Sequence, residues 1–280
     1  MTILTAPPSA SCLSSPGLVL AARVTGDWSR ALNLYAQKLK EEIADEPIVE
    51  HGAQVQVMID GPYGGCSVDL GDFESVLLVA GGSGATFTLG LLDDIVGRCI
   101  RLGRKGGERT RRIEFAWCVR SFGNSFINHF AVVYSSLITA SIEWFVPMFM
   151  DIANVAAGTS LDLHISVFVT CLCNPEAIPP IPNSSVTIIR PSIHTLLNDL
   201  LTPPTSNLSK SASIDIEEDA GEKFSESPKL NWVGLGGGVA VCASGPETLT
   251  REAHNAVAKI GMTRGVELGG IALHTELFSL

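Results

Sequence analysis

Three glycines at positions 81–84 make up the stretch of this sequence best suited to holding a charged ligand. Gly81, Gly82 and Gly84 follow the short apolar run Val76–Val79, and apolar residues then recur at helical spacing. Glycine permits a tight turn and a close approach to the backbone. A turn from a buried strand into a helix offers free N–H groups and the positive dipole end to a phosphate. The stretch Ser75–Ile95 therefore predicts a phosphate-binding turn.

The same residues allow two other interpretations. Phe87 stands where the third glycine of G-x-G-x-x-G would be, so an ordinary strand–helix turn without a ligand remains an alternative. The run Gly81–Ala85 is also one residue away from G-x-S-x-G, which would make Ser83 a hydrolase nucleophile. His274 is then a candidate partner, but no H-G-G-G motif precedes the serine and no third carboxylate stands out.

Two arginines follow expected strands and are candidates for the far end of a dinucleotide. Arg120 ends the apolar stretch Ile113–Val119, and Arg190 ends Val186–Ile189. An arginine near the end of the second strand of a dinucleotide fold accommodates a 2′-phosphate, which its planar fork binds through two parallel bonds. The sequence therefore favours NADPH over NADH, with surface arginines as the alternative.

A second turn carries a cysteine and a glycine–proline pair. Cys242 lies in an apolar run, as either a core cysteine or a residue that lines a nicotinamide pocket. Gly245 and Pro246 would let the backbone approach a flat ring. The six histidines show no paired ligand spacing, so no metal site is expected.

The periodicity of the chain predicts the elements that position these residues. Helices are expected at 142–156, 193–201 and 247–260, and a half-buried strand at 54–59. Five buried strands are expected, at 76–79, 113–119, 161–170, 186–189 and 239–243. Alternating strands and helices predict an α/β fold, a doubly wound parallel five-stranded sheet. Ligands in such sheets bind outside the strand carboxyl ends, where both glycine turns and both arginines are expected.

The amino-acid composition further narrows the class of protein. Apolar residues make up 46% of the 280 residues, enough for a substantial core, and the net charge of −10 argues against a nucleic-acid surface. The seven scattered cysteines lack a C-x-x-C pair and suggest reduced thiols of a cytosolic domain. No signal peptide is evident. The uncharged stretch Ser121–Ile142 contains polar residues and is not expected to span a membrane.

Five segments together resemble the ferric reductase and NADPH oxidase family, in its fungal ferric-chelate reductase branch. Their order and spacing carry the resemblance, which covers residue 18 to the end. They are Gly26–Trp28, Asp60–Gly64 (DGPYG), Leu78–Thr86 (LVAGGSGAT), WCVR at 117–120 with IEWF at 142–145, and ASGP at 243–246 with HTELFSL at 274–280.

The resemblance implies a ferredoxin-reductase-type NADP-binding domain and the cofactors NADPH and FAD, with haem only in a membrane domain that this chain lacks. It implies electron transfer from NADPH through FAD and haem to a ferric chelate or oxygen, at the cytosolic face of a membrane. It also assigns roles by position. The diphosphate would meet Gly81, Gly82, Ser83, Gly84 and Thr86; the 2′-phosphate would meet Arg120 and Arg190; the nicotinamide would meet Cys242, Gly245 and Pro246; the flavin ring would meet Phe278; and the junction between flavin and nucleotide would be lined by Asp60, Gly61, Pro62, Tyr63 and Gly64.

The chain also departs from this family. The haem-bearing helices and the flavin motif H-P-F-[ST] are missing, and the family's C-G-P is Ser244-Gly245-Pro246 here. We expect a disordered N-terminus at 1–17, a remnant of the FAD-binding barrel with a linker at 18–70, and the NAD(P)-binding domain at 71–280. Within that domain, 202–229 is expected to be a disordered linker. Residues 123–140 interrupt the family pattern and are either an untranslated spacer or a lid or docking segment. The chain alone is expected to be soluble and to bind FAD poorly.

Overall fold

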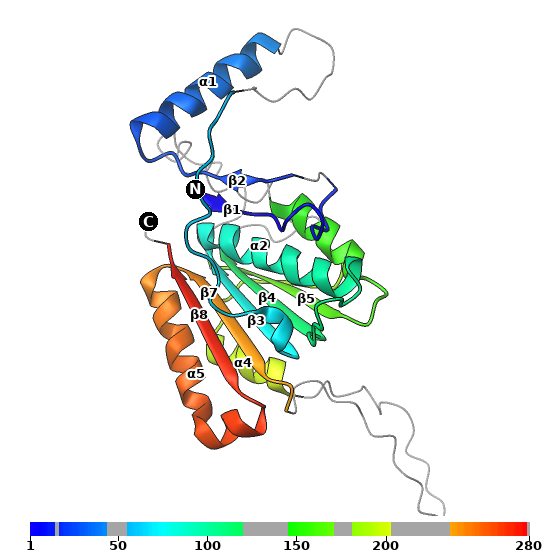
Figure 1. Cartoon of the computed structure of the whole chain (residues 1–280). Coiled ribbons are helices and arrows are strands. Elements are labelled where there is room, and N and C mark those ends of the chain that lie inside the picture. Colours follow the sequence, from blue (N-terminus) through cyan, green and yellow to red (C-terminus); the bar gives the residue numbers. More distant parts are fainter. Residues whose placement is uncertain (15–16, 44–54, 120–144, 171–180, 203–235, 279–280) are drawn as a thin grey trace, which may run out of the picture.

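The computed structural model describes residues 1–14, 17–43, 55–119, 145–170, 181–202 and 236–278. A six-stranded parallel sheet forms its centre (Figure 1). In spatial order, its strands are β6 (Ser184–Thr187), β5 (Asp162–Val169), β4 (Arg112–Val119), β3 (Ser75–Gly81), β7 (Val239–Gly245) and β8 (Ile271–Leu277).

The sequence explains why β3 and β7 lie at the centre. Every residue of β7 is buried, as are the first six of β3, and such continuous apolar runs suit strands that are covered on both faces. Strand order builds outward from β3 to β4, β5 and β6 and then returns to β7 on the other side of β3. The reversal brings the carboxyl ends of β3 and β7 together.

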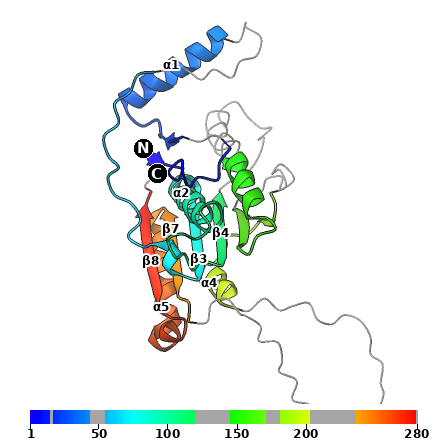
Figure 2. The same ribbon diagram turned by 45° about the vertical axis from the view of Figure 1, so that its right-hand side comes forward.

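Helices cover both faces of the sheet, as Figures 1 and 2 show. One face packs against α2 (Ala85–Val96) and a helix at 145–156, with Leu89 and Phe149 among its buried side chains. The other face packs against α4 (Ile193–Leu201) and α5 (Glu247–Glu267), with Leu197 buried. The prediction of a doubly wound parallel sheet is therefore confirmed.

The number of strands differs from the prediction. The sixth strand, β8, carries the polar run His274–Glu276, and none of its side chains is fully buried. An edge strand needs no continuous apolar run, so apolar patterning missed it. Of the strand pattern at 54–59, the described residues 55–59 are not a strand and are exposed, with Met58 97% accessible.

Few of the described residues that precede the sheet are paired in strands. A two-residue strand β1 (Thr2–Ile3) pairs antiparallel with β2 (Leu20–Ala21), and helix α1 (Asp27–Ile43) follows. Residues 55–69 run down beside β8 (Figure 1) to the 3₁₀ helix η1 (Leu70–Asp72) that precedes β3. We call residues 60–69 the connector. The expected linker at 202–229 and insertion at 123–140 lie outside the described residues, except for residue 202 at the end of α4.

Residues 1–14, the N-terminal segment, pack against α2, whereas the sequence suggested disorder. The fully buried carboxylate of Asp93 accepts hydrogen bonds from the Ala6 N–H at 2.8 Å and the Cys12 N–H at 2.7 Å. The side chains of Leu4 and Leu13 are buried beside them. Composition misled here because the Ser-, Pro- and Ala-rich segment is held by one buried carboxylate on a helix far away in sequence.

Replacing Gly97 with alanine is expected to release the N-terminal segment. A Cβ on Gly97 would overlap the carbonyl of Ala10, while alanine suits the helical backbone itself. Limited proteolysis should then cleave within residues 1–14 much faster than in the wild type. Gly26→Ala is the control, because its Cβ meets nothing within 4 Å. Equal cleavage of the Gly97 variant and the wild type would contradict the packing described here.

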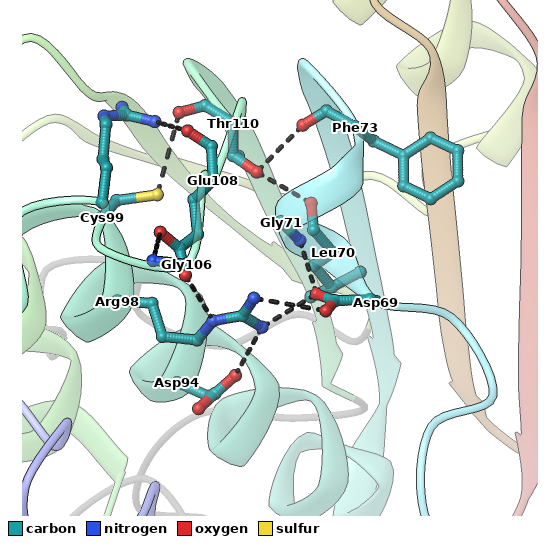
Figure 3. A network of polar contacts seen from close by, with 11 residues as sticks. Asp69, Leu70, Gly71, Phe73, Asp94, Arg98, Cys99, Gly106, Glu108 and Thr110 are labelled. Carbon is teal, nitrogen blue, oxygen red and sulfur yellow. Dashed lines mark hydrogen bonds and ion pairs between the residues drawn. The ribbon is translucent and has the colours of Figure 1, made fainter.

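The carboxyl end of α2 and the π-helix η3 (Gly97–Arg101) are held by a cluster of charges (Figure 3). The Arg98 guanidinium donates to Asp69 at 2.8 Å and to Glu108 at 3.0 Å. Asp94 lies 3.5 Å from it, one helical turn earlier. Thr110 adds hydrogen bonds to the carbonyls of Leu70 and Phe73. The cluster therefore joins η1, α2 and the chain that leads into β4.

Candidate nucleotide-binding site

The turn after β3 presents an open helix N-terminus. It consists of the 3₁₀ helix η2 (Gly82–Gly84), from which α2 begins. Gly82 has φ +55 and is exposed, with free space where a Cβ would lie. Ser83 is exposed as well. Here glycine supplies a left-handed conformation that other residues adopt at a cost, and a helix N-terminus of this kind suits an anion.

Two hydrogen bonds fix the shape of this turn. The indole N–H of Trp117 in β4 donates to the Gly82 carbonyl at 3.1 Å. The Thr86 hydroxyl donates to the Ser83 carbonyl at 2.9 Å. These bonds hold the Gly82 and Ser83 carbonyls, to which the Ala85 N–H also donates at the start of α2.

The glycine turns after β3 and β7 are in direct backbone contact. A Cβ on Gly84 would overlap the Ser244 carbonyl, and one on Gly81 would lie 2.9 Å from Pro246 Cδ. A Cβ on Gly245 would lie 3.1 Å from Gly81 Cα. The two turns can therefore meet only because both are built from glycine, and they meet where the strand order reverses, the usual ligand position in such sheets.

Phe278 reaches the same edge from β8. Its N–H donates to the Gly245 carbonyl at 2.8 Å, and its side chain is half-buried. The structure thus brings together six of the predicted site residues at or just after the ends of three strands. They are Gly81, Gly82, Gly84, Gly245, Pro246 and Phe278.

Cys242, which the family pattern placed against the nicotinamide, lies below this edge. It is fully buried, three residues before Gly245, and its Sγ is 3.7 Å from Sγ of Cys66. Ser244 stands at the edge instead. Its hydroxyl is buried and has no hydrogen-bond partner among the described residues. Sequence reasoning missed Ser244, although its place in the C-G-P pattern was a usable signal.

The turn Asp60–Gly64 is exposed, and the Tyr63 hydroxyl donates to Asp60 at 2.6 Å. Two residues later Cys66 contacts Cys242, and the Ser67 hydroxyl lies 2.9 Å from His274 Nδ1. His274 also stacks on Phe87 of α2, with ring centroids 5.5 Å apart. These contacts hold the end of the predicted junction against β7 and β8.

Of the two predicted arginines, one can be placed. Arg120 lies outside the described residues. Arg190 is exposed, with its guanidinium 3.8 Å from Glu252 of α5. Burial raises the pKa of the Cys118 thiol to about 12, and the nearby positive charge of Arg190 opposes that rise. Arg190 therefore lies near Cys118, which is at the carboxyl end of β4 and two residues before Arg120.

The described histidines do not support a hydrolase centred on Ser83. His274 is hydrogen-bonded to Ser67 and Glu276, and none of the hydrogen bonds within the described ranges joins Ser83 to a histidine. Across these same ranges no group of His, Cys, Asp and Glu side chains is placed to hold a metal ion. Nor does any described helix have the length and apolar character to cross a bilayer.

Comparison with known proteins agrees with this geometry. Residues 73–141 match the family model described as "Ferric reductase NAD binding domain". Respiratory burst oxidase homolog protein A of Arabidopsis thaliana is 35% identical over 189 residues, covering 55% of this chain and 19% of the relative. Ferric reduction oxidase 8 of the same plant is 29% identical over 114 residues, 41% of this chain and 14% of the relative. Dual oxidase of Drosophila melanogaster is 25% identical over 145 residues, which cover 52% of this chain and 8% of the relative.

Among solved structures, a ferredoxin NADP+ reductase from Neisseria gonorrhoeae with bound FAD and NADP covers 74% of this chain and 57% of its own. Its TM-score is 0.30 and the identity is 12%. This chain spans about a fifth or less of the curated relatives it matches.

The fold is a doubly wound α/β domain in which two glycine turns meet at the carboxyl edge of the sheet. Residues 73–141 match the family model for the ferric reductase NAD-binding domain, and the resemblance to that family seen in the sequence is confirmed for this segment. At the level of class, the chain carries a domain of NAD(P)H-dependent oxidoreductases.

Proposed function

We propose that this chain is the NADPH-binding part of a flavin- and haem-dependent ferric-chelate reductase. The observation that carries the proposal is the backbone contact between the glycine turns after β3 and β7, beside the open N-terminus of α2. A diphosphate at Gly82–Thr86 would continue toward Gly245 along this contact. NADPH, when bound, supplies a hydride, and FAD accepts it.

In this proposal, the chain's own residues bind the nucleotide and orient its nicotinamide. The N–H groups of Gly82–Thr86 would hold the diphosphate, and the buried Ser244 hydroxyl would find a partner in the nicotinamide. Phe278, hydrogen-bonded to Gly245, would lie against the flavin ring and shield it until the nicotinamide arrives. Asp60–Gly64 would line the junction, while the burial of Cys242 leaves it outside the contact surface.

The later steps belong to other parts of a reductase. By family resemblance, electrons would pass through haem in a membrane domain to a ferric chelate, in iron transport, with the present domain on the cytosolic face. The ferric reduction oxidase among the relatives supports a ferric acceptor, whereas the respiratory burst oxidase and the dual oxidase support an oxidase. Oxygen would be the acceptor in an oxidase.

Replacing Arg120 with alanine is expected to weaken NADPH binding and to leave NADH binding nearly unchanged. Loss of a charged hydrogen bond to the 2′-phosphate corresponds to about 1.5–3 kcal/mol. Calorimetric titration with both nucleotides measures the difference. Arg264→Ala, an exposed arginine paired with Glu267 on α5, is the control. Equal loss for the two nucleotides would overturn the assignment.

A second candidate is a remnant that binds nucleotide or a partner reductase without turnover. The short pair β1 and β2, with two residues each, favours it because so little of a flavin-binding barrel is formed in the described residues. Assaying ferricyanide reduction by the purified chain with FAD and NADPH distinguishes the two candidate functions. Turnover supports the reductase, and nucleotide binding without turnover supports the remnant.

A further inference from the structure

Two cysteines that are 176 positions apart in sequence meet beneath the glycine edge. Sγ of Cys66 on the connector lies 3.7 Å from Sγ of Cys242 in β7. Both are free thiols. A disulfide has an S–S distance of about 2.05 Å, so bonding requires only a small movement. The connector can supply that movement, because Cys66 lies outside regular secondary structure.

The two thiols differ in ways that suit a stepwise reaction. Cys66 is partly exposed, whereas Cys242 is fully buried. The hydrogen bond from Cys242 and the charge of the neighbouring His274 lower the pKa of Cys66, against burial and Glu276. The same hydrogen bond and burial raise the pKa of Cys242. Because a thiolate is the nucleophile in thiol oxidation, Cys66 is the group that reacts first.

The surroundings of the pair agree with these roles. His274 pairs with Cys242 in the register of β7 and β8, and it is held by Ser67 and Glu276. By contrast, Cys12 and Cys99 are each buried without a thiol partner in the described part of the chain, and burial raises the pKa of both. A single accessible thiolate beside one protonated thiol is typical of redox-sensitive sites.

We infer that Cys66 and Cys242 form a redox-sensitive pair that hydrogen peroxide converts into a disulfide. The Cys66 thiolate attacks one peroxide oxygen, the O–O bond breaks, and the leaving hydroxide takes up a proton as water. The resulting sulfenic acid is attacked by Cys242 sulfur, which loses its proton as the S–S bond forms, and a second water leaves. Both sulfurs are oxidised, and the peroxide is reduced to water.

The disulfide would tie the connector to a central strand. Cys66 follows the turn Asp60–Gly64 by two residues, and Cys242 precedes Gly245 by three. Oxidation would therefore fix this turn beside the edge where the glycine turns meet. The inference rests on the observed contact between the sulfurs and does not require the proposed function.

The test uses the full chain, treated with hydrogen peroxide and then digested without reductant for mass spectrometry. We expect a Cys66–Cys242 cross-linked peptide, lighter by two hydrogens than the sum of its parts and separated again by dithiothreitol. Cys99→Ser should still form it. Cys242→Ser should instead accumulate a sulfenic acid on Cys66 that reacts with dimedone.

Three results would overturn the inference. They are a cross-link between other cysteines, oxidation of Cys66 to sulfinic acid without a cross-link in the wild type, and no oxidation of Cys66 ahead of Cys99. The wild-type peptide map decides these even if the Cys242 variant fails to fold. Thermal unfolding of each variant identifies such a failure.

Discussion

Replacing Arg98 with methionine is expected to lower the free energy of unfolding by about 3 kcal/mol. The substitution leaves the Glu108 carboxylate, whose side chain is 4% exposed, without its cationic partner. It also removes the contact to Asp69 that joins the start of η1 to η3. We place the effect at the low end for a buried pair because a quarter of the Arg98 side chain meets solvent. Urea unfolding measures it.

Arg264→Met is the matched control for Arg98. Its guanidinium lies 3.2 Å from Glu267, but both side chains are about half exposed, and exposed pairs contribute about 0–1 kcal/mol. Replacing Glu108 with glutamine in the Arg98 variant should restore part of the stability, because no buried charge is left unpaired. If the two arginine substitutions cost the same, the cluster in Figure 3 does not hold the domain together.

The charge cluster also predicts how stability depends on pH. Hydrogen bonds from Arg98 lower the pKa of Asp69, and hydrogen bonds from the backbone and Arg98 lower that of Glu108 against its desolvation. A carboxyl group with a depressed folded pKa adds stability above its unfolded pKa and loses it as the pH falls through the folded value. The difference in unfolding free energy between the wild type and Arg98→Met should therefore shrink below about pH 4. A constant difference down to pH 2 would contradict this.

Replacing Gly84 with alanine is expected to reduce NADPH affinity at least about tenfold and stability by about 1–3 kcal/mol. The added Cβ would overlap the carbonyl of Ser244, which belongs to a central strand and cannot move without disturbing the sheet. The two glycine turns would then separate. Calorimetric titration and urea unfolding measure the two effects.

Gly265→Ala provides the comparison for Gly84. Its Cβ would meet nothing within 4 Å, and it lies in α5, far from the turn. Alanine favours helix, so this variant should be as stable as the wild type or more stable, with unchanged NADPH affinity. A Gly84 variant that binds NADPH like the wild type would show that the close contact between the turns is not needed.

The central part of the fold could be predicted from local pattern. An apolar run followed by glycines and a helical period defines β3, its turn and α2, and the same rule finds β7 and the start of α5. The edge strand β8 was missed because polar His274 and Glu276 lie among its apolar residues. Helix α5 extends beyond the expected Ile260 to Glu267, across a break at Gly261.

What could not be predicted depends on contacts between distant residues. No periodicity indicates that Asp93 holds residues 6 and 12, or that Cys66 meets Cys242. The glycines of the site were found because a turn requires them wherever the rest of the chain lies. Ser244 was missed because the role of the cysteine in the family's C-G-P motif was assigned to Cys242, two residues earlier. Only the strand register shows which residue stands at the edge.

The proposed diphosphate site can be tested by hydrogen exchange of the full chain, with and without saturating NADPH. Exchange is expected to slow at the amides of Gly82–Thr86 and at Gly245, while the exposed helix α1 is unaffected. Unchanged exchange at Gly82–Thr86 under saturating NADPH would contradict it, because the nucleotide's diphosphate would then rest elsewhere or not bind at all.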